Sequence, residues 1–97
     1  MHKDEIMEEF FFQVGEKREL TMEINSVVSG ETVVIASANF ELKKQFQKEV
    51  LQQGKCDING NTAEVFLEFT EEGNFILTVT SRVGREEIKK SAHITVS

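Results

Sequence analysis

The sequence GNFILTVTSRVGREEIKKSAHITVS fills residues 73–97. Apolar side chains alternate with polar ones from Phe75 to Val79, the pattern breaks at 81–84, and it resumes from Ile88 to Val96. Because successive side chains of a strand point to opposite faces, this period of two predicts two antiparallel strands joined by a tight turn at Gly84. The stretch after the turn is itself strand-like, so we expect earlier strands, and not a helix, to cover the apolar face of this hairpin.

A second hairpin is predicted upstream. Asn59 and Gly60 stand between two strand-like segments, and Asn-Gly is a strong hairpin signal. The pair predicts a type I′ turn with positive φ at both residues, so that Ile58 pairs back onto the strand that begins near Ala63.

The first half of the chain carries three further strand signals. Residues 20–24 alternate apolar and polar side chains, and residues 32–42 form a second expected strand in which Ile35 points away from the core. The triplet Phe10-Phe11-Phe12 must place phenylalanines on both faces of a sheet, so Phe11 needs a cover of its own or stays exposed.

Residues 41–53 have two interpretations. Leu42, Phe46 and Val50 are spaced four apart among good helix formers, and Gly54 is placed like a helix C-terminal cap. A helix would leave the pairing of the preceding strand incomplete, however, and the end of the segment suits a short edge strand. We therefore favour strand and loop over helix.

Composition and charge limit the partners. The 97 residues carry a net charge of -6, which repels nucleic acid, and the basic residues near the last turn are interleaved with Glu86 and Glu87. We expect a protein partner, through self-association or a larger assembly, and neither nucleic acid nor membrane. The start of the chain lacks a secretory signal and no apolar run approaches the roughly 20 residues of a membrane span, so we expect synthesis in the cytoplasm.

Chemical signatures are sparse. The single cysteine, Cys56, excludes an internal disulfide, and with His93 alone it lacks the third group that activates a nucleophile. Asp57 and Glu68 match the first and twelfth positions of a calcium loop, but the glycine falls at the fourth position and strand-like sequence follows, so we favour the hairpin. We therefore expect no catalytic residues, no cofactor and no metal, and a protein that is not an enzyme.

Several strand and turn segments follow one another in a set order: Ala38-Asn39-Phe40-Glu41-Leu42, Gly54, Asn59-Gly60-Asn61, residues 73–79, Gly84 and Ile94-Thr95-Val96. This order resembles the small immunoglobulin-like modules of tailed-phage and prophage structural proteins, such as baseplate and accessory virion proteins of phages from Gram-positive bacteria. The resemblance covers about residues 9–97. The chain departs from that pattern after Leu42, where Lys43-Lys44-Gln45-Phe46 stands in place of a turn containing glycine.

Together, the strand pattern and the resemblance predict an all-β fold, an immunoglobulin-like antiparallel β-sandwich of about seven strands. One domain is expected over residues 9–97, after a flexible acidic lead-in at residues 1–8. A chain of this length suits a single core.

We expect the function to depend on exposed side chains that contact a partner. The predicted registers turn four apolar side chains outward, and they form a candidate interaction strip of Phe11, Ile35, Phe66 and Ile76. This strip and the resemblance favour a structural or protein-interaction module, a virion or assembly component of a phage or prophage. The alternative is a carbohydrate-binding module on the same sandwich, which the lack of Trp and Tyr for stacking on sugar rings disfavours.

Overall fold

A computed structural model describes residues 7–24 and 34–97 of the chain. The described residues form strands joined by turns and loops, without a helix. The strands are β1 (Glu8–Phe12), β2 (Lys17–Glu23), β3 (Ser37–Lys44), β4 (Val50–Lys55), β5 (Asp57–Asn59), β6 (Thr62–Glu68), β7 (Gly73–Val83) and β8 (Glu86–Val96).

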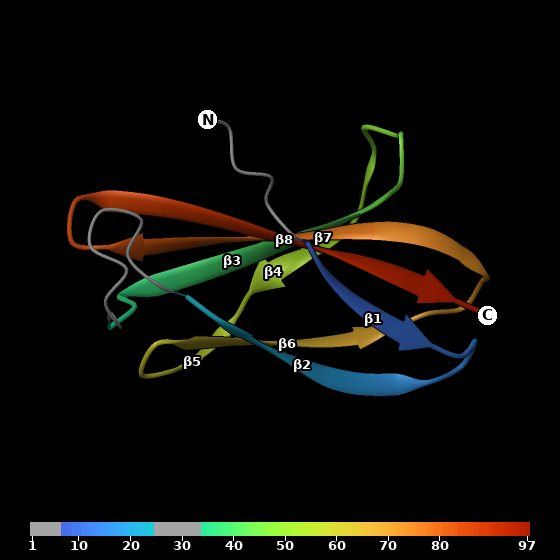
Figure 1. Ribbon diagram of the computed structural model, residues 1–97, viewed down its shortest axis with the longest axis horizontal. Coiled ribbons are helices and arrows are strands. Elements are labelled where there is room, and N and C mark those ends of the chain that lie inside the picture. Colours follow the sequence, from blue (N-terminus) through green and yellow to red (C-terminus); the bar gives the residue numbers. More distant parts are fainter. Residues whose placement is uncertain (1–6, 25–33) are drawn as a thin grey trace, which may run out of the picture.

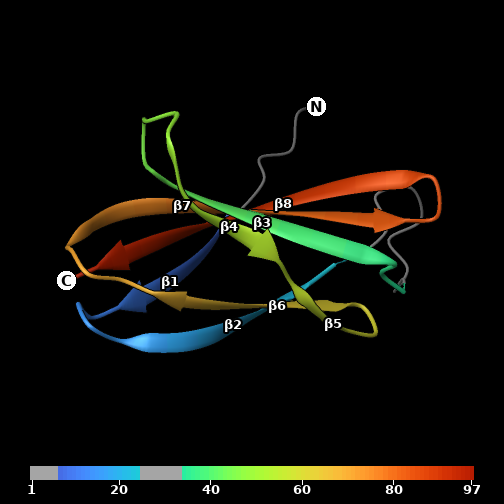
Figure 2. The same ribbon diagram turned by 180° about the vertical axis from the view of Figure 1, so that it is seen from behind.

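Two sheets pack face to face (Figures 1 and 2). One has five strands in the order β1-β8-β7-β3-β4, and the other has three in the order β2-β6-β5. This arrangement is that of an immunoglobulin-like sandwich, so the predicted all-β fold class is confirmed. Eight strands are described where about seven were expected, and β1 runs parallel to β8, which makes the larger sheet mixed and not purely antiparallel.

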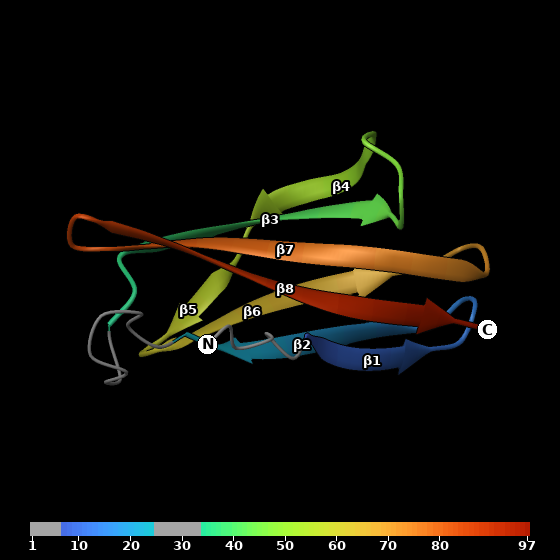
Figure 3. The ribbon, with the colours of Figure 1, turned by 45° about the horizontal axis from the view of Figure 1, so that its top comes forward.

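The predicted C-terminal hairpin is the centre of the larger sheet. β7 and β8 pair along their whole length around a turn at Gly84, whose φ of 59° favours glycine (Figure 3). The predicted break at 81–84 is wrong in its position, because β7 runs on to Val83. Ser81 continues the inward-facing register and is fully buried, and its hydroxyl has no hydrogen-bond partner among the described residues.

Three phenylalanines join the two sheets at one end of the core. The ring of Phe69 lies 4.9 Å from the ring of Phe12, edge to face, and 4.9 Å from the ring of Phe75. Since Phe12 belongs to β1, Phe75 to β7 and Phe69 follows β6, this cluster bridges both layers. Aromatic pairs at this separation add to the stabilisation that burial provides.

The prediction for the third strand is wrong at its start. Residues 32–33 lie outside the described residues, Val34 is exposed, and the strand begins only at Ser37 after a bend at Ala36. Ile35 is 4% exposed and belongs to the core. Its backbone N–H donates to the carbonyl of Gly60 at 3.1 Å, so a contact distant in sequence shifts the register that simple alternation predicted.

Strand and loop are confirmed over 41–53. β3 extends to Lys44, a turn follows, and β4 pairs with β3 through a bulge between Leu42 and Lys43. Gly54 is therefore a strand residue and not a helix cap. A Cβ at Gly54 would meet the ring of Phe40 at 3.2 Å, so the absence of a side chain lets Phe40 lie against β4.

The second predicted hairpin is confirmed, with a different turn. Asn59 pairs with Thr62, so the two central residues are Gly60 and Asn61, and only Gly60, at 64°, has a positive φ. Glycine at the first central position is typical of a type II′ turn, not of the predicted type I′ turn at Asn59 and Gly60.

We expect Gly60→Val to lower the free energy of unfolding by about 1 kcal/mol or more, because a β-branched residue disfavours positive φ. Asn59→Val is the matched control: Asn59 has an ordinary strand conformation, and its replacement should change stability by less than about 0.5 kcal/mol. Urea denaturation of the two variants measures the difference. Equal losses would instead indicate a turn centred on Asn59 and Gly60.

Candidate interaction surfaces

The four residues of the predicted strip lie in three different places. Phe11 and Ile76 are on the outer face of the five-stranded sheet, on strands separated by β8, and Ile76 is half-buried. Phe66 is on the outer face of the three-stranded sheet, and Ile35 is in the core. One contiguous strip is therefore a wrong prediction, since the outer faces of the two sheets point in opposite directions. Phe11 and Phe66 remain as separate exposed aromatic sites, 67% and 62% exposed.

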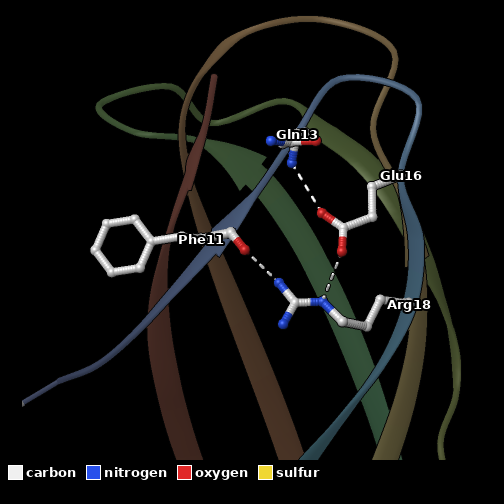
Figure 4. A network of polar contacts seen from close by, with 4 residues as sticks. All are labelled: Phe11, Gln13, Glu16 and Arg18. Atoms are coloured by element: carbon white, nitrogen blue, oxygen red, sulfur yellow. Dashed lines mark hydrogen bonds and ion pairs between the residues drawn. The ribbon is translucent and has the colours of Figure 1, made fainter.

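Phe11 is held in place by contacts of its own backbone and of its neighbour (Figure 4). The guanidinium of Arg18, on β2, donates to the carbonyl of Phe11 and lies 4.2 Å from the ring centre of Phe12. Glu16 approaches Arg18 Nε at 3.3 Å and accepts a 2.9 Å hydrogen bond from the backbone N–H of Gln13. These contacts tie β1 to β2, so the exposed Phe11 ring projects from a fixed backbone.

Phe66 stands in acidic surroundings. On β6, Glu64 and Glu68 lie on the same face two residues to either side, and Glu19 of β2 lies directly opposite Phe66. Asp57 of β5 adds a further carboxylate opposite Glu64, and Lys17 of β2 lies opposite Glu68, so the carboxylates outnumber the basic side chains here. An exposed aromatic ring among carboxylates suits a partner that combines apolar and basic side chains.

Phe46 is a third exposed aromatic residue, which the sequence analysis missed. It is 96% exposed, in the loop between β3 and β4, which stands clear of the sheets (Figures 1 and 3). Gln47 N–H donates to the carbonyl of Lys44 at 3.1 Å and closes a turn in which Phe46 has a φ of 68°. Glycine is usual at that position, and a left-handed conformation costs another residue about 1 kcal/mol. In the sequence, the one signal for this exposed residue was that Lys43-Lys44-Gln45-Phe46 replaces the glycine-containing turn expected after Leu42.

A cavity of about 310 Å³ opens between β4 and the end of β6. Its apolar wall is formed by Leu42, Leu51, Phe69 and Phe75, and its polar side includes Glu68 and Glu71. Gln52 Nε2 donates to the backbone carbonyl of Glu68 at 3.0 Å across the opening, and Lys44 pairs with Glu71 at 2.9 Å. Leu42, Phe69 and Phe75 are almost fully buried, so Leu51 is the apolar side chain that the cavity mainly exposes, beside the polar groups of Gln52, Glu68 and Glu71.

Cys56 and His93 are not brought together. Cys56 is buried where the chain passes from one sheet to the other, while His93 lies on the outer face of β8 opposite Ile76. Burial, and then the nearby carboxylate of Asp57, raise the pKa of the Cys56 thiol from 9.0 to about 11. At neutral pH the thiol is therefore protonated and a poor nucleophile.

We expect the Cys56 thiol to react slowly with Ellman's reagent in the folded protein and quickly in denaturant. The unfolded thiol ionises at a lower pH than the folded one, so its contribution to stability is complete below pH 9.0 and is lost as the pH rises towards about 11. Denaturation midpoints across this window should fall more steeply for the wild type than for Cys56→Ala. Parallel profiles would contradict the raised pKa.

The residues of the partial calcium motif lie on a hairpin. Asp57 pairs with Glu64, and Glu68 is four residues further along β6, about 13 Å away along the strand. Across the described ranges, no group of three or more His, Cys, Asp or Glu side chains is placed to hold a metal ion.

Comparisons with known proteins address the fold alone. No model of a known protein family matches the chain, and no curated protein matches it. A solved crystal structure of an engineered protein, a structural genomics target, is similar over 93% of this chain, with a TM-score of 0.69 and 10% sequence identity. The chain spans 18% of that protein's length. Nowhere in the described ranges is there a helix of the length and apolarity needed to span a membrane.

Proposed function

We propose that this domain is a non-enzymatic structural and protein-interaction module, a component of a phage or prophage virion or of its assembly. The observation that carries the interaction role is the exposure of Phe11, Phe46 and Phe66, three of the eight phenylalanines, each more than 60% exposed on a separate part of the surface. Single exposed apolar residues are common, but Phe46 also has an unfavourable backbone conformation, which argues for a role beyond packing. The phage setting rests on the resemblance in strand order.

Incorporation into particles tests this proposal. A tagged copy of the chain is expressed in a lysogen that carries the gene, the prophage is induced, and gradient-purified particles are analysed by quantitative mass spectrometry. We expect the wild type to be present at a fixed ratio to the particle proteins. The triple variant Phe11→Ser, Phe46→Gly, Phe66→Ser should be depleted, whereas Val34→Ser, which removes an exposed apolar residue outside these sites, should be retained.

Absence of the wild type from the particles would overturn the virion role. Light scattering of the purified domain with its co-purifying partners then decides whether an interaction role stands outside a virion. Saturable binding to one glycan on an array, lost in the triple variant, would favour the carbohydrate-binding alternative instead.

A further inference from the structure

In the smaller sheet, β5 is shorter than the central strand β6 beside it. β5 pairs with β6 only from Thr62 to Glu64, while β6 continues to Glu68 and pairs with β2 along all of its length (Figure 2). The second half of β6, Val65 to Glu68, therefore has no strand neighbour on the β5 side among the described residues. A strand could continue the line of β5 there.

The backbone hydrogen bonds show which groups face this vacant position. Asn61 accepts from Ile24 N–H at 2.8 Å, so the odd-numbered residues of β6 direct their backbone groups to β2. The even-numbered residues of β6 therefore direct their backbone N–H and C=O groups to the β5 side. The hydrogen bond from Gln52 Nε2 to the carbonyl of Glu68 agrees with this direction. The N–H and C=O of Phe66 and the N–H of Glu68 consequently lack backbone partners in the described part of the chain. Backbone groups of this kind are strong donors and acceptors that readily pair with an added strand.

Side chains flank the vacant position on both faces. The cavity lies at its Glu68 end, where Leu51 is exposed and Leu42, Phe69 and Phe75 form the buried wall. On the outer face lie the exposed ring of Phe66 and the carboxylates of Glu64 and Glu68. A strand added here places alternate side chains on the two faces, one set towards Leu51 and the cavity and the other beside an aromatic ring and carboxylates.

We propose that the open edge at Phe66–Glu68 binds an extended, basic peptide segment of a partner protein, which adds as a strand antiparallel to β6. Apolar side chains of the segment enter the cavity, and alternating lysine or arginine side chains pair with Glu64 and Glu68. The proposal rests on the interaction role above and names the chemistry of the partner. A second copy of this chain suits the site less well because its net charge is also negative.

The free edge of β2 is a weaker candidate because basic side chains cover it. Lys90 Nζ donates to the carbonyl of Glu23 at 2.7 Å and pairs with Glu8 at 3.1 Å, and Arg18 donates to the carbonyl of Phe11. Charged side chains at an edge are a common protection against strand addition. At the open part of β6, the described residues supply one such contact, the hydrogen bond from Gln52 Nε2 to the carbonyl of Glu68.

An NMR titration tests the proposal with a short capped peptide of alternating lysine and valine. We expect saturable shifts of the backbone amides of Phe66 and Glu68 and of the Gln52 side-chain amide, with little change along β2. A peptide with glutamate in place of lysine should not bind, and N-methylation of the valines or lysines that pair with β6 should abolish binding by removing backbone donors.

Glu68→Lys should weaken binding of the lysine–valine peptide about tenfold, because a carboxylate beside the added strand is replaced by a positive charge that repels the peptide's lysines. Leu51→Glu should also weaken it by placing a charge in the cavity. The matched control, Glu9→Lys on the five-stranded sheet, should bind like the wild type. Dispersed spectra and unchanged melting temperatures establish that each variant is folded.

Any of three results would overturn this site. They are no shift of the folded wild type up to the solubility limit of the lysine–valine peptide, equal binding of the glutamate peptide, and shifts confined to β2 or to the outer face of the larger sheet. The interaction role has a separate readout, since particles that retain Glu68→Lys at wild-type levels would show that another surface mediates incorporation.

Discussion

Phe75→Ala is expected to lower the free energy of unfolding by about 3 to 5 kcal/mol. The side chain is almost fully buried on β7, and its ring lies against Phe69 in the cluster that joins the two sheets. Truncation removes the buried apolar area and leaves a cavity that the paired strands on both sides cannot close. The total free energy of unfolding of a domain of this size is only about 5 to 15 kcal/mol, so urea denaturation should show a much lower midpoint for Phe75→Ala.

Ile76→Thr is the matched control for this prediction. Ile76 is the next residue on β7, half-buried on the outer face, and threonine keeps a β-branched side chain suited to a strand. We expect a loss below about 1 kcal/mol for this variant. If the two variants lost similar stability, the assignment of the inner and outer faces of β7 would be wrong.

The sequence predicts the fold where burial on one face imposes a regular alternation. β2 and the β7–β8 hairpin show this directly, because Leu20, Met22, Leu77 and Val79 are core residues at the predicted register. The alternation fails before β3. The bend at Ala36 is set by hydrogen bonds of the local backbone to Gly60 and Arg82, which are distant in sequence. No local pattern could predict that Ile35 turns inward.

The candidate sites are less predictable because they depend on where strands end. The open edge of β6 exists because the chain crosses between sheets at Cys56 and pairs with β6 over only three residues of β5. Alternation from Ala63 to Phe69 predicts the strand but not the length of its neighbour. The exposure of Phe46 was not predicted for another reason. Its spacing from Leu42 and Val50 suits a helix, and its turn has phenylalanine where glycine is usual.

Phe12→Ala should cost about 3 to 5 kcal/mol, comparable to Phe75→Ala, but its structural effect should be concentrated in β1. β1 is an edge strand with one neighbour, β8, and Phe12 is its deepest residue, packed edge to face on Phe69. The backbone carbonyl of Phe12 also accepts a 3.0 Å hydrogen bond from Ser97. Without the ring, β1 loses its main contact with the core, so its amides should exchange with solvent faster than those of β7.

Hydrogen exchange of Phe12→Ala and Phe11→Ala compares the loss of a buried ring with the loss of an exposed ring on the same strand, β1. Phe11 is largely exposed, so its truncation should change stability by less than about 0.5 kcal/mol and leave exchange in β1 unchanged. Phe12→Leu should give an intermediate loss, because it keeps an apolar side chain but removes the aromatic contacts with Phe69 and Arg18. If β1 stayed protected in Phe12→Ala, its pairing with β8 would be sufficient to hold it. The Phe11 ring would then be presented without help from the core.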